Sequence, residues 1–368
     1  MTPAPKNFWE LLFAAPVEAG GGQRILMRLL RKGGRPFLLL PMESRAAAAT
    51  MDLYPAQTSR ARVARLALRW LLRAMVAPGA EPVTLAVSPT DAFARWLASM
   101  AGEPESTGRL PIFGLLAGNP MSEGQRLLVL VFNARQEPVA VVKVGVTARA
   151  RQLVERETEI LAALPATTRG AVRLHGRFRS ERLSALALDF LAGDSPREDR
   201  RLPELLESWV TPDRTVQLSA LPEWQRLTPA AANDPRLARI AEALGQRVVQ
   251  ATLTHGDLTP WNIKVSPTGE WTVLDWERGE LRGVPGWDWF HYAVQPAVLV
   301  ERLPAAAIVQ RLNALLASDA FGRYAVRGGI TGCERDLLRA YLFYSAEVIQ
   351  PSEGRQETRQ LLEALLEG

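Results

Sequence analysis

The sequence has one cysteine and no long apolar run. Cys333 alone excludes an intramolecular disulfide and any metal site built from a cysteine cluster. No uninterrupted run of about 18 apolar residues occurs, so we expect no membrane-spanning helix. The N-terminal stretch carries Glu10 inside its only apolar segment, which is atypical of a signal peptide. These absences predict a soluble protein that resides in a reducing cytoplasm.

Signals for nucleic-acid binding are also scarce. The chain has 44 Lys+Arg and 39 Asp+Glu, a net charge of +5, and residues 1–80 hold 12 of the basic residues but only 4 of the acidic ones. Nucleic-acid recognition would need a recognisable binding module with a basic face and interleaved aromatics, and we find no such module. We therefore expect no nucleic-acid partner. The excess of basic residues at 1–80 must have another cause.

The length of 368 residues exceeds what one compact core usually organises, so we expect two or three lobes or domains. Apolar runs at 35–41 and 82–88 predict strands that form a small α/β lobe with a helix at 60–76. The pattern changes near residue 110 into short β-rich segments, and from about residue 193 it is mostly helical. We place the domains at residues 1–109, 110–191 and 192–368.

The middle segment begins with two apolar runs. Residues 126–132 and 139–145 flank the turn-like sequence NARQEP and predict a β-hairpin. Strong helix formers follow over 147–164, and two more strand candidates lie at 171–178 and 183–191.

The helix at 60–76 is amphipathic. Its arginines recur at spacings of three and four, at Arg62, Arg65, Arg69 and Arg73, and the apolar residues Val63, Leu66, Trp70 and Leu71 recur beside them. We expect a surface helix whose arginine face is solvated. Peripheral docking on an anionic membrane or on an acidic partner stays open as the alternative.

Polar residues gather in LTHGDLTPWNIKVSPTGEWTVLDWE, residues 253–277. Two apolar runs flank Pro-Thr-Gly-Glu, which suits a tight turn between antiparallel strands. The resulting hairpin would bring Asp275 close to Asn262 and Asp257. A carboxylate and an amide oxygen held together suit Mg²⁺, which shares its remaining coordination sites with nucleotide phosphates.

These motifs resemble those of the aminoglycoside phosphotransferase and choline kinase superfamily. HGDLTPWN, residues 255–262, has the His-x-Asp-x-x-x-x-Asn spacing of the kinase catalytic loop, and LDWE stands where the metal-binding Asp-Phe-Gly would stand. The resemblance implies an α+β, two-lobed protein-kinase-like fold with a small β-rich lobe and a larger helical lobe. The N-terminal α/β appendage, residues 1–109, lies outside it.

The resemblance also implies roles for residues of this stretch. Asp257 would be the catalytic aspartate, which accepts or positions the proton of the attacking hydroxyl, and Asn262 and Asp275 would hold Mg²⁺. His255 would brace the loop. Glu277 would reach a metal or pair with a neighbour, and both alternatives stay open.

A second motif, GVPGWDWFHY at residues 283–292, resembles the family's Gly-x-Pro-x-x-Asp segment. Its Asp288 would support the catalytic loop structurally. Its aromatic residues would belong to the core or, as the alternative, to a wall of the acceptor pocket: Trp287, Trp289, Phe290 and Tyr292.

A kinase-like cleft also needs a cation for the nucleotide phosphates. Lys143 lies in an apolar strand, where burial without a partner would be costly, and the next helix offers nearby glutamates. The resemblance favours Glu157 as the partner, with Glu155 as the alternative. Backbone groups of Asp189, Phe190 and Leu191 would meet the adenine at the hinge, and Gly114, Gly118 and Gly124 are candidates for a phosphate-covering loop that lacks Gly-x-Gly-x-x-Gly.

We therefore expect a small-molecule kinase that transfers the γ-phosphoryl group of ATP, or of GTP, to a hydroxyl acceptor such as a sugar, an aminoglycoside or an amino alcohol. Gly256 in place of the protein-kinase arginine and the absence of Ala-Pro-Glu argue against a protein kinase. The basic front of the chain favours an anionic acceptor over a polycation. The alternative is a nucleotide-binding pseudokinase that acts as a scaffold. The sequence predicts no oligomeric state.

Overall fold

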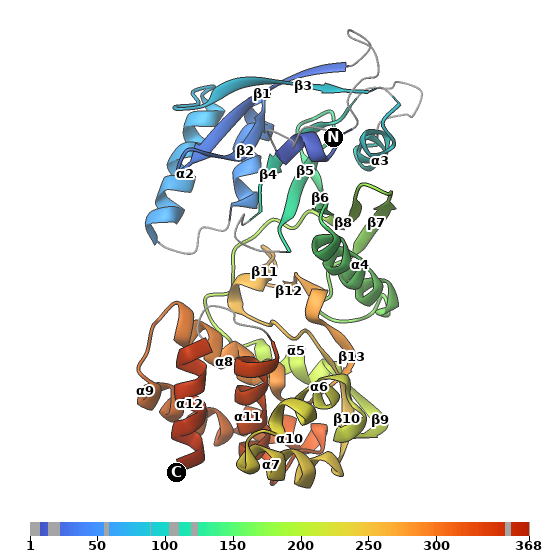
Figure 1. Cartoon of the computed structure of the whole chain (residues 1–368). Coiled ribbons are helices and arrows are strands. Elements are labelled where there is room, and N and C mark those ends of the chain that lie inside the picture. Colours follow the sequence, from blue (N-terminus) through green and yellow to red (C-terminus); the bar gives the residue numbers. More distant parts are fainter. Residues whose placement is uncertain are drawn as a thin grey trace. The chain divides into compact units, whose positions relative to one another are not determined.

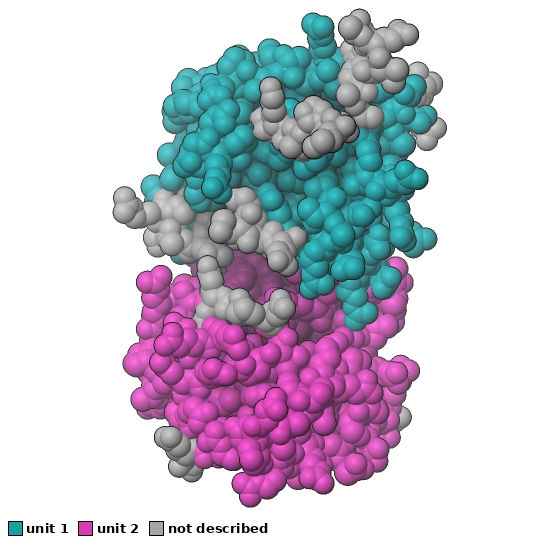
Figure 2. Space-filling view, viewed as in Figure 1, with its two compact units in different colours: residues 1–159, 172–191 teal, residues 160–171, 192–368 magenta. Residues whose placement is uncertain are grey.

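The computed structural model describes residues 8–13, 23–54, 59–88, 90–102, 110–118, 124–349 and 355–367. The chain divides into two compact units, coloured separately in Figure 2. Unit 1 comprises Met1–Glu159 and Val172–Leu191, and unit 2 comprises Ile160–Ala171 and Ala192–Gly368.

Unit 1 is built on one antiparallel sheet of eight strands in the order β3-β1-β2-β4-β5-β6-β8-β7 (Figure 1). The strands are β1 (Gln23–Lys32), β2 (Arg35–Pro41), β3 (Glu81–Val87), β4 (Ile112–Leu116), β5 (Arg126–Phe132), β6 (Pro138–Gly145), β7 (Leu174–Arg179) and β8 (Ser184–Asp189). The predicted hairpin at 126–132 and 139–145 is confirmed as β5 and β6.

Both faces of this sheet are covered, which explains why β5 is a continuous apolar run. Successive side chains of a strand point to opposite faces. Leu127, Val129 and Val131 belong to one buried cluster, whereas Leu130 and Phe132 belong to another. A strand with one solvated face would instead alternate apolar and polar residues.

The strands of the expected appendage continue the sheet of the expected small lobe. Strand β2 pairs with β4 at Leu38 and Leu116 and at Leu39 and Leu115. Gly114, expected to cover phosphate, lies within β4, where a Cβ atom would be 2.1 Å from Thr50 Oγ1, so it is a packing position. Residues 119–123 of that expected loop lie outside the described residues. The domain boundary at 109/110 stays a prediction.

Helices complete unit 1, and one of them is turned differently from our expectation. They are α1 (Ser44–Thr50), α2 (Ser59–Arg73), α3 (Ala92–Met100) and α4 (Ala148–Ala163), whose last residues belong to unit 2. We expected the arginine face of α2 to be solvated, and this prediction was wrong in part. Arg69 is half-buried and pairs with Asp52, whereas Val63 and Trp70 are exposed. Asp52 and the carbonyl oxygen of Tyr54 accept hydrogen bonds from Arg69 and Arg65, so these arginines turn inward.

Unit 2 is mainly helical. Its helices are α5 (Leu202–Trp209), α6 (Pro222–Ala231), α7 (Pro235–Gly245), α8 (Trp287–Leu299), α9 (Ala305–Leu316), α10 (Asp319–Gly328), α11 (Glu334–Phe343) and α12 (Arg355–Glu367). Two of these helices begin at a side chain that caps the helix. Asp234 caps α7 by accepting from the Arg236 N–H, and Ser318 caps α10 by accepting from the Phe321 N–H.

Two small antiparallel sheets also belong to unit 2. One has the order β13-β10-β9, from β9 (Val210–Gln217), β10 (Val248–Thr254) and β13 (Glu280–Gly283). The other is the predicted hairpin, β11 (Ile263–Val265) with β12 (Trp271–Val273), and it is confirmed. The expected α+β class, with a β-rich part and a larger helical part, is confirmed as well. None of the described helices has the length and apolarity needed to cross a membrane.

Candidate active site

A buried carboxylate holds the turn that follows β10. Asp288, in the first turn of α8, accepts the backbone N–H of His255 through Oδ2 at 2.6 Å and that of Gly256 through Oδ1 at 2.9 Å. Burial raises the pKa of Asp288 above its ordinary value, although these two hydrogen bonds act in the opposite direction. Hydrogen bonds to a charged acceptor are stronger than neutral ones, so Asp288 fixes the start of the loop.

The buried ring of His255 links this loop to the end of β12. Its Nε2 lies 2.6 Å from the carbonyl oxygen of Leu274, to which it donates, and its Nδ1 accepts the backbone N–H of Asp257 at 3.2 Å. A neutral imidazole satisfies both bonds, because it has one donor and one acceptor. This geometry orients the backbone at Asp257 and offers no role in proton transfer to an exposed group.

Gly256 lies between these two residues in a backbone conformation that other residues rarely adopt. Its φ is 74°, and a Cβ atom would lie 2.6 Å from the carbonyl oxygen of Arg278. Both the left-handed backbone and the close approach require glycine. The turn therefore explains why glycine precedes Asp257.

The side chain of Asp257 accepts hydrogen bonds from several sides while staying 33% exposed. His291 Nε2 lies 3.1 Å and Arg278 Nη1 3.4 Å from Oδ1, and Asn262 Nδ2 lies 3.3 Å from Oδ2. Burial raises the pKa of Asp257, but the hydrogen bond from His291 and the positive charges nearby outweigh it, so this pKa lies below its ordinary value. Asp257 is therefore ionised at neutral pH and oriented by its donors.

Asn262 ends the same loop. Its Nδ2 also donates to the backbone carbonyl of Asp257 at 2.9 Å, which leaves the amide oxygen Oδ1 as the atom that can bind a cation. The β11–β12 hairpin then returns the chain, because Leu274 N–H donates to the Asn262 carbonyl at 2.8 Å. Asp275 follows Leu274 directly, so the hairpin brings the two predicted metal ligands to its open end.

Asp275 has a left-handed backbone, with φ 64° and ψ 55°, and precedes the short 3-10 helix Trp276–Arg278 that contains Glu277. A non-glycine residue in this region costs about 1–3 kcal/mol and often marks a functional position. Within unit 2, Asn262, Asp275 and Glu277 thus supply hard oxygen atoms. This donor set fits Mg²⁺ rather than a metal that prefers sulfur or imidazole ligands.

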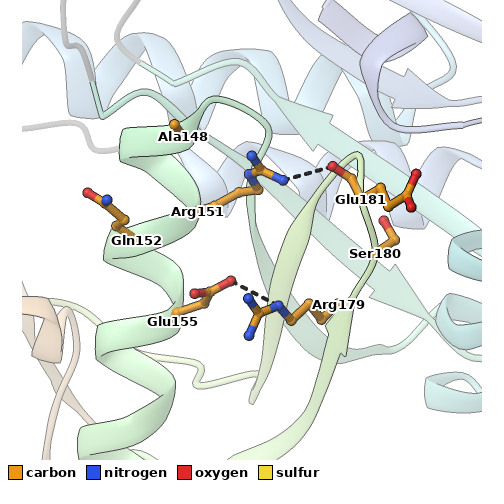
Figure 3. A pocket seen from close by; sticks show the side chains of 7 residues that line it. All are labelled: Ala148, Arg151, Gln152, Glu155, Arg179, Ser180 and Glu181. Atoms are coloured by element: carbon orange, nitrogen blue, oxygen red, sulfur yellow. Dashed lines mark hydrogen bonds and ion pairs between the residues drawn. The ribbon is translucent and has the colours of Figure 1, made fainter.

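Unit 1 holds a buried ion pair. Lys143 on β6 donates to both carboxylate oxygens of Glu157 on α4, at 2.7 and 2.9 Å, and the two side chains are 8% and 0% exposed. Glu155, the alternative partner, accepts from Ser184 at 2.7 Å and pairs with Arg179 at 3.5 Å, where both line a pocket of about 450 Å³ (Figure 3). The structure therefore pairs Lys143 with Glu157.

The expected hinge residues follow the end of β8. The backbone N–H of Asp189 donates to Arg173 and that of Phe190 to Val139, both at 3.3 Å, and the Asp189 side chain lies 3.1 Å from His175 Nδ1. These two N–H groups are engaged within the sheet, so an adenine would have to use the N–H of Leu191 or backbone carbonyls. The role of Asp189, Phe190 and Leu191 stays a prediction.

A family comparison covers parts of both units. Residues 149–325 match the phosphotransferase enzyme family. The family resemblance is therefore confirmed. The match also gives the enzyme class, a phosphotransferase. The matched range contains Glu157 and the whole segment from His255 to Asp288, whereas Lys143 precedes this range.

Solved structures with a partial likeness come from the same group of enzymes. Aminoglycoside phosphotransferase APH(4)-Ia, in complex with ADP and hygromycin B, has 13% identity, a TM-score of 0.45 and coverage of 74% of this chain and 97% of its own. Choline kinase LicA from Streptococcus pneumoniae has 14% identity, a TM-score of 0.41 and coverage of 69% and 92%. No curated protein matches the chain. At these TM-scores, the assignment depends on the family match and on the geometry above.

Sequence reasoning missed one residue that contacts the candidate catalytic aspartate, His291. In the structure its Nε2 donates to Asp257, and its Nδ1 lies 3.1 Å from the hydroxyl of Tyr341, which is buried. Burial raises the pKa of Tyr341, so its hydroxyl stays protonated and can donate to Nδ1. The signal was available, because His291 is one of only 3 histidines and follows Asp288 by three positions on a helix.

The aromatic neighbours of His291 are mostly core residues. Trp287, Trp289 and Phe290 are buried, and they pack against aromatic rings of α10 and α11. Tyr292 is half-buried. This packing favours the core role for the three buried rings.

Proposed function

We propose that the protein is a small-molecule kinase that transfers the γ-phosphoryl group of ATP, or of GTP, to a hydroxyl group of a small acceptor. The observation that carries this proposal is the environment of Asp257. Its carboxylate is ionised, partly exposed and oriented by His291 and Asn262. We further propose the cytoplasm as its location, because a chain with a single cysteine suits a reducing compartment.

In this proposal Asp257 positions the acceptor hydroxyl. It does not remove the hydroxyl proton before the bond to phosphorus begins to form. Phosphoryl transfer passes through a loose transition state in which the nucleophile needs orientation more than activation. A carboxylate whose pKa is lowered is a weak base but a good hydrogen-bond acceptor. It would hold the acceptor hydroxyl in line with the phosphorus atom, and the proton would transfer to it late.

Asn262 and Asp275 would bind Mg²⁺, with Glu277 near enough in sequence to assist. The ion would supply charge neutralisation for the phosphate oxygens. The left-handed backbone of Asp275 supports this role, because the cost of that conformation is otherwise unexplained.

Lys143 would contact the nucleotide phosphates, and Glu157 would orient its ammonium group. Two short hydrogen bonds fix the lysine headgroup in a buried position, where a charge acts more strongly than in water. The same pair would be an expensive structural device if it had no ligand to serve.

The test is Mg²⁺-dependent transfer from labelled ATP and GTP to pooled sugars, aminoglycosides, amino alcohols and nucleosides. The variant Asp257→Asn should lose at least about a hundredfold in rate, because it removes the acceptor charge but keeps the side-chain shape. Asp319→Asn, at an exposed aspartate of α10, is the matched control and should keep full activity.

Nucleotide binding by both variants shows that they are folded. If wild type binds nucleotide but transfers to no pool and hydrolyses nucleotide no faster than Asp257→Asn does, the kinase proposal is wrong and a scaffolding role gains support. Equal transfer by wild type and Asp257→Asn would reject the role of this residue.

A further inference from the structure

Helix α2 exposes a stripe of large apolar side chains to solvent. Val63, Leu66 and Trp70 are 67%, 53% and 70% exposed, and they share one helical face because they are spaced by three and four residues. Met75 and Val76, which follow the helix end, are also exposed, at 69% and 50%. Of the 12 most exposed large apolar residues in the described chain, half lie between residues 63 and 76, so this is a concentrated patch.

The opposite face of α2 is anchored in unit 1, so the exposure of the stripe is not a consequence of a loose helix. Leu72 is fully buried in the cluster that also contains residues of α1 and β2. Arg69 pairs with Asp52, and Arg65 donates to the carbonyl of Tyr54 at 3.4 Å. These contacts fix the rotation of the helix and leave the apolar stripe without a place in the core.

Positive charge runs beside the stripe. Residues 53–80 contain five arginines and no acidic residue. At 100° per residue, Arg62 and Arg73 lie along one edge of the stripe, and the Arg73 guanidinium lies 5.9 Å from the centre of the Trp70 ring. Trp and Arg side by side are typical of surfaces that meet the headgroup region of a bilayer.

We propose that α2 docks the protein on the surface of an anionic lipid bilayer. Val63, Leu66 and Trp70 enter the interfacial region, while Arg62 and Arg73 contact the headgroup phosphates. Charge complementarity selects this occupant over a second copy of the chain, because a symmetric contact would bring two rows of arginine together with no acidic residue of the segment between them. The inference does not depend on the proposed kinase activity.

The experiment is flotation of the full-length protein with vesicles of phosphatidylcholine alone or with about 30% phosphatidylglycerol. Wild type should float with the anionic vesicles only, and binding should weaken as salt is raised. The double variant Leu66→Glu/Trp70→Glu should lose at least about tenfold in binding, because it removes apolar area and adds negative charge. Each of Arg62→Ala and Arg73→Ala should lose about fivefold.

The matched control is Val300→Glu/Val326→Glu, which adds the same charge at two exposed apolar positions of unit 2, 56% and 73% exposed. It should bind like wild type. All the substituted side chains are exposed, so circular dichroism and melting temperature should not change.

Three results would overturn the proposal. The first is a lack of binding to anionic vesicles, which would direct attention to an acidic protein partner. The second is equal loss in the control variant, which would mean that net charge alone decides. The third is a wild-type dimer by light scattering that becomes a monomer in Leu66→Glu/Trp70→Glu, since the stripe would then be a contact between copies.

Discussion

Replacing Lys143 with methionine should destabilise unit 1 by about 3–5 kcal/mol, the usual cost of removing one partner from a buried ion pair. The pair has the features that make this cost high. Glu157 is fully buried, the lysine is 8% exposed, and both carboxylate oxygens accept from the same ammonium group at 2.7 and 2.9 Å. In Lys143→Met the carboxylate loses both hydrogen bonds and the compensating charge.

The double variant Lys143→Met/Glu157→Leu should recover most of that loss. Replacing both members of a buried ion pair by apolar groups of similar size is often neutral or stabilising. The two positions should therefore couple by about 2 kcal/mol or more in a double-mutant cycle. Lys32→Met, at an exposed lysine of β1, is the control and should change stability by less than about 1 kcal/mol.

Amide hydrogen exchange is the suitable assay, because a chain with two compact units need not unfold in one step. Peptides from β6 and α4 report the local free energy of opening, and a loss of 3–5 kcal/mol corresponds to a drop of about 6–20 °C in melting temperature for a domain of 150–250 residues. Phosphoryl transfer should be absent in both lysine variants, including the stable double variant. A destabilisation below about 1 kcal/mol by Lys143→Met, or a double variant no more stable than the single one, would refute this reasoning.

Other predictions concern the loop and its surroundings. His291→Ala should lower the turnover rate about 10–100-fold with little change in nucleotide KM, and the acid limb of the rate profile should move to higher pH because His291 lowers the pKa of Asp257. Burial raises the pKa of Glu223 from 4.5 to about 7, so its contribution to stability is present below about pH 4.5 and is lost as the pH rises through 7. Glu223→Gln should thus be more stable than wild type by about 3 kcal/mol at pH 8.5 and equal to it near pH 4.5, measured by thermal unfolding. Gly256→Ala should cost at least about 1–2 kcal/mol and most of the activity, because its Cβ would meet the Arg278 carbonyl; a fully active alanine variant would contradict the account of this turn.

The sequence predicted the parts of the site that local chemistry specifies. The hairpin β11–β12 follows from a Pro-Thr-Gly-Glu turn between two apolar runs, and Gly269 has the positive φ, 81°, that the turn requires. Asp257, Asn262 and Asp275 were predicted because they lie on this loop and hairpin. Their spacing along the chain nearly determines their spacing in the structure.

The choice between Glu155 and Glu157 needed the structure. Residues two apart on a helix point about 200° from each other, so one glutamate had to face β6 and the other had to face away. Sequence could not give the rotation of α4 about its axis. The buried environment of Val154 and Ile160 fixes it, with Glu157 inward and Glu155 toward Ser184.

The rotation of α2 was missed for a related reason. Its hydrophobic period is regular, but the face that turns inward carries Leu72 together with Arg69 and Arg65, whose acceptors are Asp52 and Tyr54. Those acceptors precede the helix and carry no periodic signal. The contact between His291 and Tyr341 is likewise invisible in sequence, because 50 residues separate them.

The loop around Asp257 concentrates features that are costly to folding. Asp288 is a buried carboxylate, the non-glycine residue Asp275 has a positive φ, and His255 fills a fully buried position with its ring. Each feature alone could be a structural accident, but their common effect is to fix the backbone on both sides of Asp257 while its carboxylate stays partly exposed. Selection for stability alone would favour cheaper residues at these positions. These destabilising features lie close together, and all of them fix the position of the Asp257 carboxylate. We conclude that the loop maintains the position of this carboxylate more than its basicity, in agreement with its lowered pKa.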